Sequence, residues 1–514
     1  MDHIPRLSEV LYVGLCREIG TPTEVAIRRD VMDMKEMIRR PVDNHKGYAA
    51  MNSGSYREGF RLTSSDIDTM TWLCQFKLIT DISQFRIYNT SKHFILLMED
   101  FDTPPGFVRL RLLTPQNKFI ISMCLAEFNG GVYMSGSLWR EFYFQFHAND
   151  RYFQQKNIRN HGPCVTGVDG TLEFDQAACF ASIYWPKQTR DWFDRCQRHT
   201  WPPVLVLEKI LRNGFHCVPI GSKIVSTSNE LEWRLSFSQA EQQLVCIMNH
   251  TQFLCYGLLK IFLKDVINFR VEPRLCSYFM KTTMFWMIQL GHLIWLPNRL
   301  LDCFWKCFKY LIYCVYEGDF PNFFIPQNNM FINKMVADTR ASLLQQLYQY
   351  YRMGVTCLLL SPTLKSILEP ALSSPSFVLS TAEGEFITLY YYRTAKYEKA
   401  LHIIYLSKQR LSEDNIIYFN TVDRHRLGNR SQCLQSLTDL QTLLLCDDNV
   451  YALLETRDIA WQILGICQHI VGDLYGALQS YEVSLRQYQY NKIQEATLIR
   501  IECVKEQQHR IMQA

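Results

Sequence analysis

The sequence predicts an α+β fold with two lobes, followed by an all-helical region. Between about residues 45 and 235, short apolar runs recur with a period of two, which is typical of strands. Residues 238–328 are strongly apolar at helical spacing, which indicates a bundle packed around its own core. Residues 335–514 read almost entirely as amphipathic helix. We therefore expect domains at 1–237, 238–334 and 335–514, in line with 514 residues at roughly 150 residues per domain.

The first expected element is a long helix over residues 7–40, which Gly20, Thr21 and Pro22 interrupt. Its apolar positions at helical spacing are Leu11, Val13, Leu15, Val25, Met32 and Met37. Strands are expected next, in the runs FRIYN, FILLME, FVRLRLL, KFIISMCL and TLEFDQAACF, with Pro, Gly and Asn turns between them. The helix and these strands make up the expected N-terminal lobe.

The helical lobe contains the most apolar window of the chain, residues 284–296. A bilayer span needs ~20 such residues, so we expect a buried helix here and no membrane contact. The 18 cysteines form no CxxC pair, and the leading residues MDHIPRLSEV do not read as a signal peptide. These features predict reduced thiols and a cytoplasmic protein. A net charge of +4 is too small to identify a nucleic-acid binder by total charge.

The C-terminal region carries a repeat signal. Residues at the spacings of a tetratricopeptide unit are Trp461, Leu464, Gly465, Ala477, Tyr481 and Ser484. Residues 396–401, and Cys433 with Leu437, match the second helix of such a unit less well. The alternative is a helical bundle with chance similarity, but we favour tetratricopeptide-like helices. Because repeat helices mainly bind proteins, we expect a protein partner here.

Two short motifs in the strand-rich part indicate chemistry. Gly54 and Ser55 form a turn in NSGSYREGF, and Asp66-Ile67-Asp68 follows in SSDIDTMTW. Taken singly, such motifs are usually a simple turn and a solvated strand end or helix cap. On a strand, however, alternation places Asp66 and Asp68 on one face. Two carboxylates that close repel each other unless a cation neutralises them, and oxygen-only ligands favour Mg²⁺ or Mn²⁺.

A third carboxylate is expected from the strand TLEFD, where Glu173 and Asp175 share one face. We prefer Asp175 for its spacing to Trp185, although Glu173 stays an alternative. Three acids can hold two metal ions for an in-line nucleotidyl transfer, while the Gly-Ser turn holds phosphates through backbone N–H groups. The combination predicts a polymerase-beta-like nucleotidyltransferase.

The chain resembles the cyclic GMP-AMP synthase-like receptors and the related male abnormal 21 (Mab-21) family over about residues 5–330. The resemblance rests on GSYREGF followed by DID, HGPCVTG, a third acid ahead of Tyr184-Trp185-Pro186, Trp192 to Arg195, Trp201-Pro202 and WRLSFSQAEQQL. The last of these is the most specific match, and in the family it leads from the catalytic lobe into the helical lobe.

The resemblance implies roles for individual residues. The metal ligands would be Asp66, Asp68 and Asp175, and the phosphate-binding turn would be Gly54 and Ser55. Residues that would contact base or phosphate are Arg159, Arg234, Lys260, Ser277 and Tyr278. Each of the last group has a plainer interpretation: Lys260 as a solvated lysine, Tyr278 as one more core aromatic, and Arg234 as an ion-pair partner of Glu241.

The implied activity is that of an enzyme that joins two nucleoside triphosphates, ATP and GTP, into a cyclic dinucleotide second messenger, as an innate immune sensor. The alternative is a catalytically inactive Mab-21-type scaffold that binds nucleotide or protein in development or signalling. A cleft that holds a single nucleotide structurally is a third interpretation. We favour the enzyme, because a scaffold has no physical need for three uncompensated carboxylates in one cleft.

Vertebrate members of the family carry a zinc-binding insertion after the WRLSFS-like segment. Here that stretch holds only Cys246, His250 and Cys255, which make no four-ligand site, so we expect no structural zinc. The resemblance then favours double-stranded RNA over DNA as activator. A footprint for it would be Arg28, Lys35 and Arg39, with Arg29 and Arg40 beside them. The preferred alternative is a solvated helix face that Asp30, Asp33 and Glu36 balance.

Overall fold

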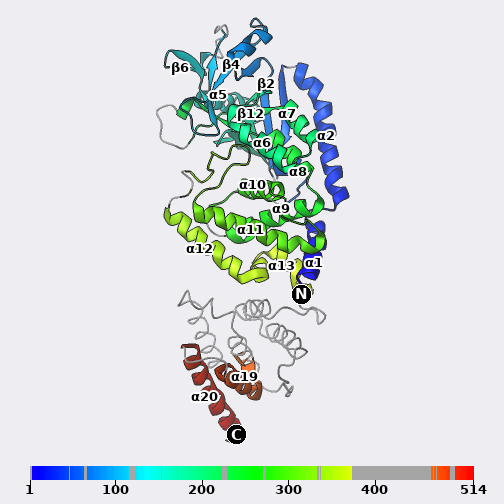
Figure 1. Cartoon of the computed structure of the whole chain (residues 1–514), viewed down its shortest axis with the longest axis vertical. Helices are drawn as coiled ribbons and strands as arrows, with labels where there is room; N and C mark the ends of the chain where they lie inside the picture. Colours follow the sequence, from blue (N-terminus) through cyan, green and yellow to red (C-terminus); the bar gives the residue numbers. More distant parts are fainter. Residues whose placement is uncertain are drawn as a thin grey trace. The chain divides into compact units, whose positions relative to one another are not determined.

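The computed structural model describes residues 3–45, 47–62, 66–114, 122–151, 153–170, 172–222, 229–269, 274–332, 335, 337–372, 465–466, 468–469, 472–486 and 492–513. Figure 1 labels their helices and strands. The chain divides into two compact units. The larger unit comprises residues 12–260 and 272–344, and the smaller unit comprises residues 1–11, 261–271 and 345–514. The three-domain division expected from the sequence stays a prediction.

The expected N-terminal helix is broken in two, as α1 (His3–Glu18) and α2 (Pro22–His45). Gly20 lies at the break with a φ of +128°, a conformation that other residues rarely adopt. Thr21 and Glu24 then form a capping box: the Thr21 N–H donates to Glu24 Oε2 at 2.7 Å, and the Glu24 N–H donates to Thr21 Oγ1 at 3.3 Å. With Pro22 at its first position, α2 therefore begins where the sequence signals a new helix.

The larger unit contains two sheets. The first has the strand order β1-β2-β10-β9-β8. Its strands are β1 (Tyr48–Ser53), β2 (Ile67–Leu73), β10 (Leu172–Ala178), β9 (Cys164–Asp169) and β8 (Arg159–His161). Neighbouring strands are antiparallel except β2 and β10, which are parallel. This parallel pair matters for the site, because it joins strands from distant parts of the sequence.

The second sheet has the strand order β11-β12-β13-β5-β4-β3, and β7 joins it beside β5 with β6 as its further neighbour. These strands are β3 (Phe76–Ile79), β4 (Phe94–Glu99), β5 (Phe107–Leu112), β6 (Leu125–Phe128), β7 (Gly131–Met134), β11 (Phe180–Ser182), β12 (Phe215–Val218) and β13 (Glu232–Ser236). Phe180 and Trp233 are fully buried with ring centroids 4.8 Å apart. Such aromatic and aliphatic side chains form the core that fixes the sheet.

The strand predictions hold with two exceptions. The run FRIYN falls largely on the 3₁₀ helix η1 (Ile82–Ile87) instead of a strand. A capping box explains this difference, because Asp81 accepts from the Ser83 N–H at 2.8 Å and Gln84 accepts from the Asp81 N–H at 3.3 Å. In the run KFIISMCL, a strand begins only at Leu125, and residues 118–121 lie outside the described part of the chain.

Helices make up most of the rest of the larger unit. They are α3 (Gly54–Arg57), α5 (Gly136–Ala148), α6 (Arg190–His199), α7 (Val204–Asn213), α8 (Ser238–Cys246), α9 (His250–Phe262), α10 (Ser277–Gln289) and α11 (Leu300–Glu317), with the 3₁₀ turns η2 (Lys187–Thr189), η3 (Asn229–Leu231) and η5 (Pro297–Arg299). The apolar stretch 238–328 thus forms helices α8 to α11, as expected. The window 284–296 is helical only to Gln289, where Gly291 with a φ of +71° follows the helix end.

The smaller unit is helical in its described part. It includes the π-helix η4 (Leu263–Ile267), the later part of α12 (Ala337–Met353), η6 (Gly354–Leu360), α13 (Pro362–Leu372), α19 (Leu474–Arg486) and α20 (Lys492–Gln513). Gln346 donates to the Ile267 carbonyl at 3.0 Å, which ties α12 to η4. None of the helices in the described ranges combines the length and apolar character that a bilayer span requires.

The tetratricopeptide signal is only partly covered by the structure. A Cβ at Gly465 would lie 2.6 Å from the Tyr481 ring, so this pair shows the close approach that a small residue permits. Ala477, Tyr481 and Ser484 are buried. The other residues of the signal, Trp461, Leu464, 396–401, Cys433 and Leu437, lie outside the described residues. A tetratricopeptide-like fold therefore stays a prediction.

Candidate active site

Strand register places three of the expected site residues in one row across the first sheet. Asp68 of β2 lies opposite Asp175 of β10, and Asp175 lies opposite Thr166 of β9. Thr166 in turn lies opposite Arg159 of β8. Residues in register on neighbouring strands point to the same face at about 4.8 Å per strand. Asp68 and Asp175 are therefore immediate neighbours, whereas Arg159 is two strands away from Asp175.

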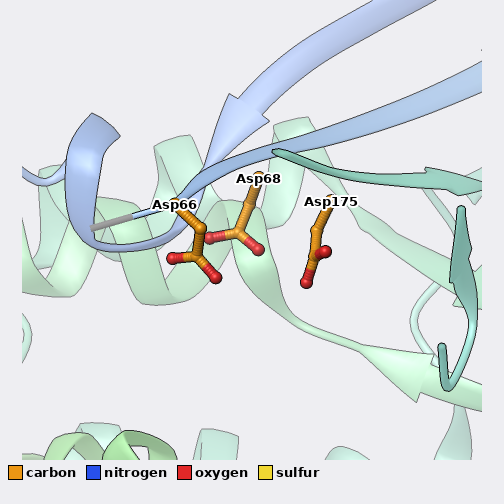
Figure 2. A group of neighbouring side chains, drawn as sticks. All are labelled: Asp66, Asp68 and Asp175. Carbon is orange, nitrogen blue, oxygen red and sulfur yellow. The ribbon is translucent and has the colours of Figure 1, made fainter. Parts of the chain in front are cut away.

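The three predicted acids converge. Asp66 comes directly before β2, so that it and Asp68 project on one side with Ile67 between them. Figure 2 shows the carboxylates of Asp66, Asp68 and Asp175 pointing into a common space. One oxygen from each lies within 4.8 Å of the others, and all three side chains are half-buried. Glu173, the alternative third ligand, is exposed on the same strand and is not part of this group.

This group carries more negative charge than its surroundings balance. Burial, and then the carboxylates of Asp66 and Asp175, raise the pKa of Asp68 to about 7. Burial and Asp66 also raise the pKa of Asp175. Lys281, near Asp68, and His161 and Arg159, near Asp175, offset these effects only in part. Three hard oxygen donors with uncompensated charge fit a divalent cation such as Mg²⁺ or Mn²⁺.

The Gly54-Ser55 turn opens α3 directly beside the acids. Ser53, the last residue of β1, pairs in register with Asp68. The turn from β1 into α3 therefore lies next to the Asp68 carboxylate. Gly54 has a φ of +70°, and a Cβ built there would lie 1.6 Å from Asp68 Oδ2. Glycine is therefore required here twice, for its backbone conformation and for the close approach of the carboxylate.

Replacing Gly54 with alanine is expected to displace the Asp68 carboxylate and reduce divalent-cation affinity at least about ten-fold. The unfolding free energy should also fall by about 1–3 kcal/mol, because alanine is strained at positive φ. Mn²⁺ titration followed by calorimetry, with urea melts, would measure both effects. Gly130 is a matched control, since it also has positive φ but no atom lies within 4 Å of an added Cβ. Equal Mn²⁺ affinity in Gly54→Ala and wild type would contradict the expected crowding.

Lys260 of α9 reaches the turn. Its Nζ donates to Ser55 Oγ and lies 4.7 Å from the Phe60 ring centroid. Burial lowers the pKa of Lys260 to about 8, although the Glu58 carboxylate opposes that effect. Lys260 is therefore no solvated surface lysine but a half-buried ammonium group directed at the expected phosphate-binding turn.

Tyr278 and Ser277 open α10 on another wall of the site. The Tyr278 hydroxyl donates to Glu241 Oε1 at 3.0 Å and accepts from Asn322 Nδ2 at 3.2 Å. Burial raises the pKa of this hydroxyl well above its ordinary value. These two bonds fix the ring of Tyr278, which is half-buried, while Ser277 is exposed.

A cavity of about 530 Å³ connects these elements. Its walls include Gly54, Ser55, Asp66, Asp68, Arg234, Ser277, Tyr278 and Lys281. Arg234 is exposed on β13 and, among the described residues, makes no ion pair with Glu241. Lys260, Asp175 and Arg159 are not among the described residues that line this cavity. The structure thus gathers most of the predicted residues at one cavity and leaves Arg159 at the sheet edge.

Sequence reasoning missed a buried ionic network at the wall of the cavity. Lys281 Nζ lies 2.6 Å from Glu58 Oε1 and 3.3 Å from Glu241 Oε2, and all three residues are buried. Burial opposes the charge on Lys281, but the carboxylates of Glu58 and Glu241 outweigh it and raise its pKa. A signal existed in the sequence, because Lys281 is an isolated lysine in the apolar run YFMKTTMFWM. Its partners, however, come from other elements.

The basic residues of α2 do not form the candidate nucleic-acid footprint as a group. Arg28 donates to the Ile19 and Gly59 carbonyls, and Arg29 donates to the Glu58 carbonyl at 2.8 Å. Asp33 and Glu36, the expected balancing acids, pair instead with Arg57. Lys35 is exposed, and the side chains of Arg39 and Arg40 lie outside the described part.

Two family models match the chain. Residues 164–246 match the Mab-21 protein nucleotidyltransferase domain, and residues 252–349 match the Mab-21 protein HhH/H2TH-like domain. The first range contains Asp175 and Arg234, and the second contains Lys260 and Tyr278. The matched domains lie on a mixed fold of sheets and helices, with the strand-rich part preceding the helical part.

Known proteins show the same resemblance. Cyclic GMP-AMP synthase of Sus scrofa is 25% identical over 338 residues, which cover 60% of this chain and 62% of that protein. Cyclic GMP-AMP synthase of Mus musculus is 25% identical over 169 residues, or 30% of this chain and 33% of that protein. A cyclic GMP-AMP synthase-like receptor of Magallana gigas is 28% identical over 169 residues, which cover 31% of this chain and 27% of that protein.

The predicted resemblance to Mab-21 proteins and cyclic GMP-AMP synthase-like receptors is therefore confirmed. The chain carries a nucleotidyltransferase domain of this type followed by an HhH/H2TH-like domain. The matched segment spans about 62% of the length of the Sus scrofa relative.

Proposed function

We propose that the chain is a metal-dependent nucleotidyltransferase that joins two nucleoside triphosphates, ATP and GTP, into a cyclic dinucleotide second messenger. One observation carries the proposal: Asp66, Asp68 and Asp175 direct three carboxylate oxygens to within 4.8 Å of one another. Burial, and then the carboxylates of Asp66 and Asp175, raise the pKa of Asp68 to about 7. Holding this buried charge is costly unless a cation binds.

Each residue of the site has a defined task in this proposal. Asp66, Asp68 and Asp175 would hold Mg²⁺ or Mn²⁺, which supplies charge neutralisation of the triphosphate and activation of the attacking hydroxyl. Gly54 and Ser55 offer backbone N–H groups to phosphate oxygens, and Lys260 adds a positive charge beside Ser55. The fixed ring of Tyr278 offers a stacking surface for a base.

The two arginines have less specific tasks. Arg234 is exposed on the cavity wall, where it can pair with phosphate or base. Arg159 lies in the same row as the acids, beyond Thr166, and would contact a longer substrate at the sheet edge. Ser277 would contribute a hydroxyl beside Tyr278.

The biological setting belongs to the proposal as well. The names of the relatives, cyclic GMP-AMP synthase and cyclic GMP-AMP synthase-like receptor, support a cyclic dinucleotide product and a receptor role. We further propose that the protein acts as an innate immune sensor in the cytoplasm. Double-stranded RNA is the proposed activator, bound without Arg28 and Arg29, which are engaged within the chain. A protein partner is proposed for the helices of residues 335–514.

The test is product formation by the purified chain with ATP, GTP and Mg²⁺ or Mn²⁺, with and without double-stranded RNA or DNA, analysed by mass spectrometry. We expect a cyclic dinucleotide from the wild type and at least about a thousand-fold less from the Asp66→Asn/Asp68→Asn double variant. Glu173→Gln is the matched control, because this exposed acid shares the strand but not the group. Nucleotide binding without turnover under every condition would favour the inactive Mab-21-type scaffold.

A further inference from the structure

Helix α2 has a second apolar face that its own unit does not cover. Val25 and Met32 are buried, at 3% and 4% exposure, and pack towards the larger unit. Ile27, Val31 and Met34, here called the α2 stripe, are 56%, 37% and 50% exposed. At 100° per residue, the stripe lies on the side of the helix opposite Val25 and Met32. Figure 1 shows α2 along the outer side of this unit.

The spacing of the stripe is that of a two-helix seam. Its residues follow one another by four and then three positions, as do the d, a and d positions of a coiled-coil heptad. In this register Val31 occupies an a position, where β-branched residues favour a two-stranded arrangement. A nucleic acid would gain nothing from such a surface, because phosphate binding requires cations rather than apolar side chains.

Opposite charges flank the stripe. Asp30 lies on one side at a g position, and Lys35 lies on the other side at an e position. Both are exposed, and within the described residues neither forms an ion pair. The neighbouring charges are engaged, since Glu24 caps the helix, Arg28 and Arg29 bond backbone carbonyls, and Asp33 pairs with Arg57.

We propose that α2 is a dimerisation helix on which a second copy of this chain docks in parallel, stripe against stripe. In a parallel pair, a g residue meets the e residue five positions further along the other helix. Asp30 of each copy then meets Lys35 of the other, twice by symmetry. An antiparallel pair would instead place like charges opposite each other, which disfavours it.

The strength of the dimer follows from the size of the stripe. Three apolar side chains over two helical turns bury an area at the low end of specific interfaces, so we expect a dissociation constant in the micromolar range, about 1–50 μM. The two ion pairs between Asp30 and Lys35 add little to the free energy of dimerisation, but they favour the parallel orientation over the antiparallel one.

Sedimentation velocity of the full chain at about 1–100 μM tests the proposal. We expect Asp30→Lys or Lys35→Asp alone to weaken dimerisation at least about ten-fold, because each creates two like-charge contacts. The Asp30→Lys/Lys35→Asp double variant should return to within about three-fold of wild type. Ile27→Glu should leave a monomer, whereas Leu205→Glu, at an apolar position on α7 that is even more exposed (78% against 56%), should dimerise normally.

Two outcomes would overturn the proposal. One is a wild type that stays monomeric throughout this concentration range. The other is a dimer that the single charge reversals leave unchanged or that the double variant does not restore. Circular dichroism checks that the variants fold, and the substituted positions Ile27, Asp30 and Lys35 are all exposed.

Discussion

Asp68→Asn should make the metal-free protein more stable while abolishing its response to divalent cations. The carboxyl of Asp68 has a pKa of about 7 in the folded chain against an ordinary 3.8, because burial and two neighbouring acids disfavour its ionised form. The folded state therefore holds its proton more tightly than the unfolded chain. Below pH 3.8 the carboxyl is protonated in both states and does not change the free energy of unfolding. Between pH 4 and 7 the free energy of unfolding falls as pH rises, because Asp68 ionises in the unfolded chain before it ionises in the folded chain.

The size of this effect follows from the shift. A shift of about three pKa units corresponds to a loss of at most about 4 kcal/mol of unfolding free energy. Because water partly reaches the half-buried Asp68, we expect a loss of about 2–4 kcal/mol above pH 7. Asparagine cannot ionise and does not carry this cost. The variant should thus melt several degrees higher than wild type at pH 8 in EDTA, with little difference at pH 4.

Thermal melts at both pH values would measure the prediction. Millimolar Mg²⁺ or Mn²⁺ should raise the melting temperature of the wild type and of the control Glu173→Gln, but not that of Asp68→Asn. A variant that is less stable than wild type at pH 8 in EDTA would show that Asp68 makes stabilising contacts instead of carrying uncompensated charge.

Lys281→Met is expected to cost about 3–5 kcal/mol of unfolding free energy. Lys281 compensates the charges of the buried Glu58 and Glu241 at 2.6 and 3.3 Å, and methionine would leave both carboxylates without their cation. The loss should extend to the site, because Glu241 also accepts the hydrogen bond that fixes Tyr278.

A double-variant cycle separates charge from packing in this network. Glu58→Gln combined with Lys281→Met should be more stable than Lys281→Met alone, because one buried charge is removed with its partner. Lys209→Met on the exposed surface of α7 is the control and should change stability by less than about 0.5 kcal/mol. If Lys281→Met melts in urea at the same midpoint as this control, the network contributes no stability.

Much of the architecture could be predicted from local pattern. Alternation along SSDIDTMTW places Asp66 and Asp68 on one face, because side chains on a strand alternate whatever the strand pairs with. The break at Gly20 and the start of α2 at Pro22 follow from capping residues within a few positions of one another. The run FRIYN shows the limit of such patterns, since a local capping box made a 3₁₀ helix there.

The identity of the third acid depended on a contact between distant segments. Glu173 and Asp175 share one face in the sequence, and only the parallel pairing of β10 with β2 sets Asp175 against Asp68. Register between strands depends on the packing of the whole sheet, which no local period encodes. The same holds for Lys281, whose charge could be read from the sequence but whose partners Glu58 and Glu241 could not.

By itself, the sequence determined which residue types were available and on which side of each helix or strand they lie. The tertiary structure alone decided which of them meet. Arg28 and Arg29 look like surface cations in the sequence, yet their guanidinium groups donate hydrogen bonds to backbone carbonyls of their own chain. The reason is that charge, burial and hydrogen bonding are properties of the surroundings of a side chain, and those surroundings are assembled from segments far apart in the chain.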